Sequence, residues 1–476
     1  MLFIETKSAE VKVERSLRTP ALEALGERGL VPLIRAARLH FFEQALAGAE
    51  HVRELEQAVA VWTDDEGGAP YVRGDVFCSE DYAHFVIFGD ADAGVGVRAG
   101  IIYDAEAADP AGKLEAFCRN VQEALESAVR RAPAGASVPD FQNVRWRLRE
   151  GRTAEAFRSF AGGGVGAAAA APARAGGAAE RAQAVEILED TAARGFLQRL
   201  SEAHADGRVA EMLSAEGRGP EQESLVARLA GAGLVKREVQ VSCRKDGRSL
   251  FRLPSPDALA IVTASNAVCS ECGTPVADER AEELVTPTPL ASAMLKDSAW
   301  LVNRLSSILA ELGVPEREVA ARQAAEGEAQ LLANVCGEPF FFVLRDGDFT
   351  AAHARRALDG ESETHAQHVV VLATGRIQDE ARARLREHAR RRLRAGGEAE
   401  VVFVEGLDAA PAELRRSVER VSREALTREL YELDESAGFN VGYALAARFR
   451  LVEHKSALQD LAASAAGALA AGLNEF

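Results

Sequence analysis

Apolar residues in the first part of the chain follow two different spacings. In residues 21–46 and 113–132 they recur every three or four positions, which predicts amphipathic helices. In residues 71–104 short apolar runs are bounded by Gly and Asp, which predicts strands. Residues 1–155 are therefore expected to form a small α/β domain. The Gly- and Ala-rich stretch 161–179 lacks any such pattern and is typical of a flexible linker.

The C-terminal part of the chain has the most regular pattern. Largely apolar runs at 339–345, 368–374 and 400–406 alternate with amphipathic segments, the longest of them from Ile377 to about Arg394. Strands that are apolar throughout become buried on both faces, and the intervening helices cover them. This alternation therefore favours a buried, largely parallel sheet between layers of helices.

Between these two parts, helical patterns at 184–217 and 220–235 lead into strand-like segments within 237–254. Two helices, the segment LVARLAGAGLV and a hairpin resemble a winged-helix domain, in which Gly233 would end the second helix in a left-handed conformation. The resemblance implies that this helix binds DNA in the major groove. Arg228 is one of the few side chains there that could reach a base; packing of the module against protein is the alternative.

A pair of similar cysteine-containing segments follows. Cys269-Ser-Glu-Cys272-Gly273 has the spacing at which two thiolates can bind one ion, with Gly supplying the unusual backbone angle. The same frame occurs at Cys243-Arg-Lys-Asp246-Gly247, where Asp stands in place of a second cysteine. The two segments together resemble a zinc ribbon. We therefore expect Cys243, Asp246, Cys269 and Cys272 to bind one structural zinc ion.

Two other interpretations of this region remain open. The Lys-Asp-Gly segment is also suited to the turn of a hairpin, so the segment from Cys243 to Gly247 could be the tip of the wing. The ribbon could also have lost its metal and be held by packing alone. The six cysteines of the chain are otherwise scattered, a pattern that fits thiols or a metal better than a disulfide framework.

Residues 326–425 resemble the restriction-endonuclease-like (PD-(D/E)XK) superfamily. The segment EGEAQLLANV precedes the strand PFFFVLR and the turn DGDF, as an acidic segment precedes a strand in that superfamily. The resemblance implies a site in which two acidic residues and a lysine position a divalent cation and a water molecule against the scissile phosphate. A hard cation needs oxygen ligands, and its charge stabilises the transition state.

This chain departs from that pattern at each expected catalytic position. Gln330 stands where the first acidic residue is expected, Val343 where the acidic residue of the strand is expected, and Arg345 in place of the lysine. Only Asp346 and the Gly-Asp-Phe after it remain. Valine has no ligand atom, so we expect a pseudo-nuclease domain that does not catalyse hydrolysis.

Acidic residues near the same turn could still have taken over the catalytic role. Glu328, Asp346 and Asp348 are the candidates if the domain is active. Alternatively, these residues simply cap the ends of a strand and a helix. The chain contains no GxxxxGK[ST], HExxH, GxGxxG or nucleophile-elbow motif.

A basic segment stands out in an acidic chain of net charge −17. At helical spacing, Arg382, Arg386, Arg390 and Arg394 form one stripe beside an apolar stripe. Because affinity for nucleic acid comes largely from neutralising phosphates, this stripe is a candidate nucleic-acid contact. The alternative is a solvated helix face whose arginines pair with neighbouring acidic residues.

The length of 476 residues exceeds what one core usually organises and suits several domains. No apolar run is long enough to span a membrane, so we expect a cytoplasmic protein. The Ala-rich segment 458–476 is expected either to pack back or to form a homodimer. We expect the chain to divide into seven parts: an N-terminal α/β domain (1–155), a linker (156–180), a winged helix (181–240), a zinc-ribbon-like segment (241–290), a helical connector (291–325), a restriction-endonuclease-like domain (326–425) and a helical tail (426–476).

Together these features predict a multi-domain α/β protein that associates with DNA or another nucleic acid without cutting it. It would act as a regulator, or as an adaptor subunit of a DNA-processing or defence system, and would have protein partners. Two alternatives remain open: a metal-dependent nuclease with relocated carboxylates, and a protein–protein scaffold that does not contact nucleic acid.

Overall fold

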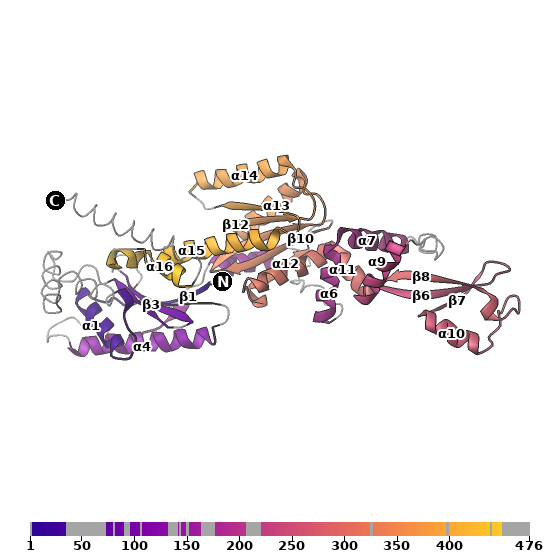
Figure 1. Cartoon of the computed structure of the whole chain (residues 1–476). Helices are drawn as coiled ribbons and strands as arrows, with labels where there is room; N and C mark the ends of the chain where they lie inside the picture. The colour runs from indigo at the N-terminus through magenta and orange to yellow at the C-terminus, as the bar shows by residue number, and fades with distance from the viewer. Residues whose placement is uncertain are drawn as a thin grey trace.

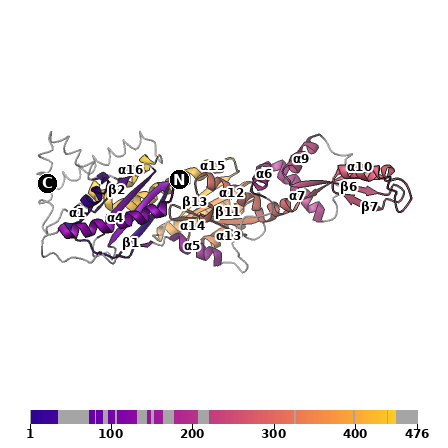
Figure 2. The ribbon, with the colours of Figure 1, turned by 90° about the horizontal axis from the view of Figure 1, so that it is seen from below.

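The computed structural model places three sheets in a row along an elongated molecule (Figures 1 and 2). It describes residues 2–34, 73–79, 81–89, 96–104, 107–131, 141, 144–148, 152–162, 177–205, 220–323, 327–396, 399–437 and 440–449. Most of the Gly- and Ala-rich stretch and the segment 458–476 lie outside these residues. Helices and strands are mixed throughout, which confirms the expected α/β multi-domain class.

The N-terminal sheet has the strand order β2-β3-β4-β1-β5, and all its neighbouring strands are antiparallel. Its strands are β1 (Leu2–Ala9), β2 (Gly74–Cys78), β3 (Tyr82–Phe88), β4 (Val97–Asp104) and β5 (Arg147–Leu148). Helices α1 (Arg15–Gly26) and α4 (Pro110–Arg131) cover one face. Leu114, Phe117, Val121 and Leu125 recur at helical spacing on α4 and are buried against the sheet.

The central sheet has the strand order β13-β12-β11-β10-β9. Its strands are β9 (Val319–Gln323), β10 (Glu328–Val335), β11 (Glu338–Arg345), β12 (His368–Ala373) and β13 (Glu400–Glu405). The first three form an antiparallel meander, and only β11, β12 and β13 are parallel. The expectation of a largely parallel sheet is therefore wrong for its first half, because apolar strands buried on both faces look alike whichever way they run.

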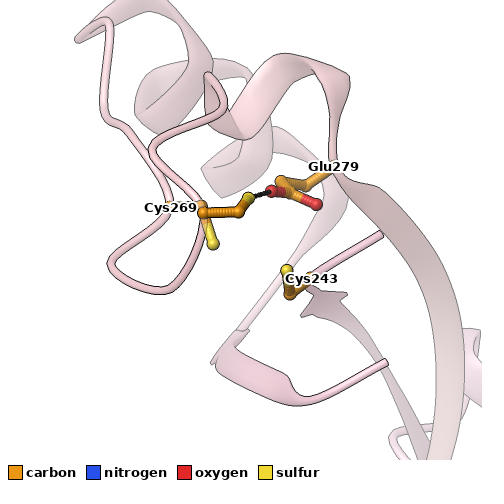
Figure 3. A group of neighbouring side chains, drawn as sticks. Cys243, Cys269 and Glu279 are labelled. Carbon is orange, nitrogen blue, oxygen red and sulfur yellow. Dashed lines mark hydrogen bonds between the residues drawn. The ribbon is translucent and has the colours of Figure 1, made fainter. Parts of the chain in front are cut away.

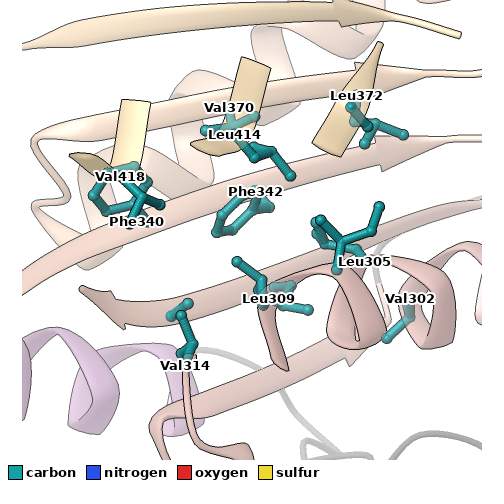
Figure 4. Packing of buried hydrophobic residues seen from close by; sticks show 14 of the residues in the cluster. Val302, Leu305, Leu309, Val314, Phe340, Phe342, Val370, Leu372, Leu414 and Val418 are labelled. Atoms are coloured by element: carbon teal, nitrogen blue, oxygen red, sulfur yellow. The ribbon is translucent and has the colours of Figure 1, made fainter. Parts of the chain in front are cut away.

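Helices cover both faces of the central sheet. On one face, α12 (Ala299–Glu311) and α15 (Ala410–Ala437) enclose Phe340, Phe342, Val370 and Leu372, as Figure 4 shows. On the other face lie α5 (Arg152–Gly162), α13 (Ala351–Thr364) and α14 (Asp379–Arg394). Because Phe341 and Val343 face this second layer, alternate residues of β11 serve two different cores.

Two elements cross the boundaries expected from the sequence. Helix α5 spans residue 155 and packs Ala156 and Phe160 on the central sheet. Helix α15 is continuous past residue 426, and with α16 (Val441–Arg448) it also packs on the free face of the N-terminal sheet. The two ends of the chain therefore share one core, in which Leu2 and Leu445 are both buried.

The third sheet forms an arm at one end of the molecule (Figure 1). Helices α6 (Ala178–Glu189), α7 (Thr191–Ala205), α9 (Pro220–Gly231) and α11 (Pro289–Leu295) pack at its base. Its strands β6 (Val235–Ser242), β7 (Ser249–Leu253) and β8 (Arg280–Pro287) are antiparallel in the order β7-β6-β8. Gly233 has φ +69°, the left-handed end of α9 that the sequence predicts. Helix α10 (Pro256–Ala264) lies near the tip.

Candidate metal centre

Two turns of the same design meet at the tip of the arm. In each, the amide of a cysteine donates to the carbonyl five residues later, and the amide of a glycine donates back to the carbonyl of that cysteine. The distances are 2.7–2.9 Å, and the glycines have φ +73° and +75°. The residues are Cys243, Gly247 and Arg248 in one turn, and Cys269, Gly273 and Thr274 in the other. The repeated frame in the sequence is therefore a repeated backbone structure.

These turns bring four ligand atoms together. The sulfurs of Cys243, Cys269 and Cys272 and a carboxylate oxygen of Glu279 all lie within 4.8 Å of one another. Figure 3 shows Cys243 and Cys269 approaching the same space from opposite turns, with Glu279 beside them. Cys243, Cys269 and Glu279 are buried, and Cys272 is half-buried. The group can hold one metal ion, which agrees with the expected metal site.

Glu279 is oriented by donors from both turns. The thiol of Cys272 donates to Glu279 Oε1 at 2.9 Å, and the backbone amide of Arg244 donates to Glu279 Oε2. These two hydrogen bonds, that from Cys272 being the larger effect, lower the pKa of the Glu279 carboxyl below its usual value. The carboxylate is thus ionised and held in place, as a metal ligand must be.

The thiol of Cys243 is protonated in the absence of a metal. The pKa of the Cys243 thiol is raised to about 11: the backbone amide of Asp246 favours the thiolate, but burial and the neighbouring thiol and carboxylate oppose it more strongly. A metal ion that binds here therefore displaces the proton of Cys243. Three sulfurs and one oxygen form a donor set that suits zinc, and four protein ligands leave no open position for a substrate.

Asp246 is not among the four converging ligands, contrary to the expectation from the sequence. Glu279, not Asp246, belongs to the group of converging ligand atoms. Asp246 Oδ1 instead accepts a hydrogen bond from the amide of Arg248 at 3.0 Å, closing the turn of the β6–β7 hairpin. Glu279 was missed because it follows Cys272 by seven residues outside any repeated frame. Glu279 immediately precedes β8, and it is the position of β8 that brings it beside the two turns; no periodic pattern in the sequence indicates this.

The expected catalytic positions of the central domain are filled by structural contacts. Val343 is fully buried, and Gln330 Oε1 accepts a hydrogen bond from Arg322 Nε at 2.7 Å. The guanidinium of Arg322 lies 4.6 Å from the ring centre of Phe160 on α5. Phe160 in turn packs edge-on against Phe341. Helix α5 therefore covers the face of the sheet to which Val343 points.

Glu328 forms a buried ion pair with Arg356. It is completely inaccessible to solvent, and its two oxygens accept hydrogen bonds from Arg356 at 2.9 and 2.6 Å. His353 Nε2 lies 3.3 Å from Glu328 Oε1. Because His353 Nδ1 accepts from the amide of Thr350 at 2.8 Å, the proton of the neutral ring is on Nε2 and faces Glu328. Burial lowers the pKa of His353, which keeps the ring neutral.

Asp346 and Asp348 hold separate parts of the turn after β11. Asp346 pairs with Arg194 at 3.1 Å and accepts hydrogen bonds from Thr374 and Trp300 at 2.8 and 3.3 Å. The exposed Asp348 accepts from the amide of Arg376 at 2.9 Å. Within the described residues, the cysteine group is the one place where three or more potential ligands converge. Glu328, Asp346 and Asp348 are therefore not gathered into such a group.

The arginine stripe of α14 divides into paired and unpaired residues. Arg382 pairs with Glu405 at 2.8 Å, and its guanidinium lies 5.1 Å from the ring centre of Phe403. Arg386, Arg390 and Arg394 are exposed and form no ion pair with any residue that the structure describes. The guanidinium of Arg386 lies 5.3 Å from the ring centre of Phe403, so three of the four predicted cations lack an ion pair but one of them contacts an aromatic ring.

Arg228 on α9 is not free. It pairs with Asp190 at 3.0 Å, in a bridge that is about half exposed. Such surface pairs contribute little free energy, so this bridge would not by itself prevent Arg228 from contacting another partner.

Comparisons of the chain with protein-family models, with curated proteins and with solved structures each find no match. Across the described residues, no helix combines the length and the apolar character needed to cross a bilayer.

Proposed function

We propose that this protein is a non-catalytic nucleic-acid-associated protein, a regulator or an adaptor subunit, whose central domain is a pseudo-nuclease. The observation that carries the proposal is the row of exposed arginines at Arg386, Arg390 and Arg394, which form no ion pair with a described residue. Residues four apart on a helix lie about 6 Å apart along its axis and share one face. Such a row can follow a phosphate backbone, and α14 carries seven arginines against three acidic residues.

The topology of the central sheet supports the pseudo-nuclease part of the proposal. An antiparallel meander followed by a parallel crossover is compatible with the restriction-endonuclease-like resemblance. The chemistry of hydrolysis is missing, because Val343 has no oxygen and Arg322, Gln330 and Phe160 fill the face. Such a domain can bind a polyanion, but it does not hold the cation that would cleave it.

The arm supports a second contact with the same ligand. Three helices followed by β6 and β8 have the element order of a winged helix, with the ribbon and α10 inserted in its wing. Arg244 and Lys245 beside the metal centre are exposed and form no ion pair with a described residue. We propose that zinc holds the two turns together, so that these cations are presented in a fixed position at the tip of the arm.

The proposal is tested by binding of fluorescent single- and double-stranded DNA and RNA at low ionic strength. The Arg386→Glu/Arg390→Glu/Arg394→Glu variant should lose most of its affinity, because each reversal replaces an attraction by a repulsion. The matched control is Arg317→Glu/Arg415→Glu/Arg416→Glu. It makes the same change in total charge at exposed positions off α14, and Arg415 and Arg416 lie on α15, on the other face of the sheet.

Equal loss in both triple variants would show that only the total charge of the protein matters. Absence of binding by the wild-type protein to every nucleic acid would reject the proposal in favour of the scaffold. The net charge of −17 makes that outcome physically reasonable, and it is the reason for using a control of matched charge.

A further inference from the structure

A pocket of about 580 Å³ opens between α15 and α16, on the opposite layer of the molecule from α14. Its wall includes Arg420, Arg423, Arg428, Tyr431 and Tyr443. Four of these residues lie on α15, and their spacing of three, five and three brings them along one side of that long helix. The concentration of arginine and tyrosine in one hollow is unusual in an acidic chain with only five tyrosines.

Two of the three arginines are already neutralised by acidic residues of the central sheet. Arg420 pairs with Glu400 on β13 and lies 3.4 Å from Glu424. Burial opposes ionisation of Glu400, but hydrogen bonds from His368 and Arg420 outweigh it and lower the pKa of the carboxyl. Arg428 pairs with the buried Glu338 on β11. These two arginines are therefore held at the pocket wall by the sheet beneath them.

Arg423 is different, because its guanidinium has no acceptor among the described residues, although Glu424 lines the same pocket. It is half-buried, its Nε is shielded from solvent, and that atom has no hydrogen-bond partner. No ion pair joins it to any described residue. A partly desolvated guanidinium without an acceptor is unfavourable for a protein unless a ligand supplies the missing negative charge. A cation at the wall of a pocket is suited to this purpose.

The aromatic residues give the pocket a second binding element. Tyr431 is 63% exposed although it is a large side chain, and Tyr443 lines the same hollow from α16. An exposed aromatic face beside a guanidinium can stack on a flat ring, while the guanidinium binds a phosphate through paired N–H donors. A ligand that combines both groups is a nucleotide.

We propose that this pocket binds a mononucleotide, with its phosphate on Arg423 and its base against Tyr431. The ligand would supply the acceptor that Arg423 lacks among the described residues, and it would cover the exposed ring. The site does not depend on the nucleic-acid contact proposed for α14, because the two lie on different layers of the protein. Binding at one can therefore be lost while the other is kept.

The test is calorimetric titration of the full-length protein with AMP, GMP, CMP and UMP in a buffer free of phosphate. We expect at least one of them to bind, and to raise the melting temperature in proportion to its concentration. Arg423→Glu should weaken binding at least about tenfold, since a charge-assisted pair is replaced by repulsion. Tyr431→Ala should weaken it by about tenfold or less. Arg415→Glu, the same change at an exposed position of α15 outside the pocket, should leave it unchanged.

A structural role of Arg423 is distinguished by Arg423→Met, which keeps the aliphatic contacts and removes the charge. We expect this variant to melt no lower than the wild type without ligand, and to lose the nucleotide-dependent shift. Three results would overturn the proposal: no nucleotide binds at millimolar concentration; Arg423→Glu binds as well as Arg415→Glu; or pyrophosphate binds as tightly as the nucleotides and Tyr431→Ala has no effect. The last result would indicate a simple anion site.

Discussion

Gln330 on β10 lies directly opposite Val343 on β11 in the antiparallel register of the central sheet. Residues that face each other in this way point to the same side of a sheet. These are the two positions at which the expected resemblance to restriction endonucleases would require carboxylates. One of them carries an amide engaged by Arg322, and the other carries an aliphatic side chain that is fully buried.

We therefore predict that the pure protein cleaves neither DNA nor RNA. Incubation with single- and double-stranded substrates in magnesium or manganese should give no product above the buffer control, because no pair of oxygens is available to hold the cation. Asp348→Ala provides the sharpest check for contamination, since Asp348 is the most exposed of the candidate acidic residues. Cleavage that disappears in that variant would support the alternative of a nuclease with relocated carboxylates.

Glu328 should prove to be a structural residue. In Arg356→Met its buried carboxylate loses both strong hydrogen bonds, and breaking a buried pair in this way costs about 3–5 kcal/mol of unfolding free energy. The double variant Glu328→Gln/Arg356→Met should recover part of that loss, because no charge is then left buried. Chemical denaturation of the three proteins measures the difference. If Arg356→Met is as stable as the wild type, Glu328 is free to serve another role.

The pattern of the sequence predicted individual strands and helices better than it predicted how they assemble. The apolar runs at β11, β12 and β13 were found because a buried strand has a distinct composition. The direction of β10 and the edge strand β9 could not be found, because hydrophobicity carries no information about orientation. The sharing of α15 between two sheets was equally hidden, since Leu414 and Leu433 are simply two apolar positions of one helix until both sheets are present.

The metal centre shows the same division between local and distant information. Cys269, Cys272 and Cys243 were found because a tight turn imposes a fixed spacing on its ligands. Asp246 was chosen on that spacing, but it closes its own turn instead. Glu279 immediately precedes β8, and only the pairing of β8 with β6 brings it to the site. A ligand supplied by strand pairing has no signature in a single sequence.

His84 should make the stability of the N-terminal domain dependent on pH. Its ring stacks on Phe117 with 4.3 Å between ring centres, and its Nε2 is buried without a partner among the described residues. Burial lowers its pKa to about 4, from an ordinary value near 6.5. Protonation therefore favours the unfolded state. This contribution is fully present above about pH 6.5 and is lost as the pH falls towards 4, by about 1.4 kcal/mol per pH unit within that window.

The measurement is denaturation of the wild type and of His84→Gln between pH 4 and 7.5. Carboxyl groups also titrate in the lower part of this range, so only the difference between the two proteins reports on His84. That difference should shrink as the pH falls from 6.5 towards 4, because the wild type alone loses the contribution. A difference that does not change with pH would mean that the ring is protonated or hydrated in the folded protein.

If the row on α14 contacts phosphates, its removal should change the salt dependence of binding as well as the affinity. Each phosphate neutralised on a nucleic acid adds about 0.7–0.9 to the slope of log K against log salt. Neutralising Arg386, Arg390 and Arg394 together with glutamine should therefore reduce the slope by about 2–3. The glutamine version of the control triple, at Arg317, Arg415 and Arg416, should keep the slope of the wild type. A lower affinity with an unchanged slope would indicate that the α14 variant is damaged in another way.

The fourth ligand of the metal centre can be identified by comparing two neutral substitutions. Elemental analysis of purified protein should find about one zinc per chain, and Cys269→Ser should lose it, because a closed four-ligand site tolerates no missing ligand. Glu279→Gln should also bind zinc more weakly in competition with a chelator. Asp246→Asn should bind it nearly as well as the wild type, since Asp246 closes its turn and lies outside the group of converging ligand atoms. Cys118→Ala, which removes a buried cysteine far in sequence from the metal centre, is the control for loss of a thiol.

The opposite order, with Asp246→Asn losing the metal and Glu279→Gln retaining it, would restore the ligand set expected from the sequence. Wild-type protein that contains no metal and takes up none would show that the two turns are held by their backbone hydrogen bonds alone.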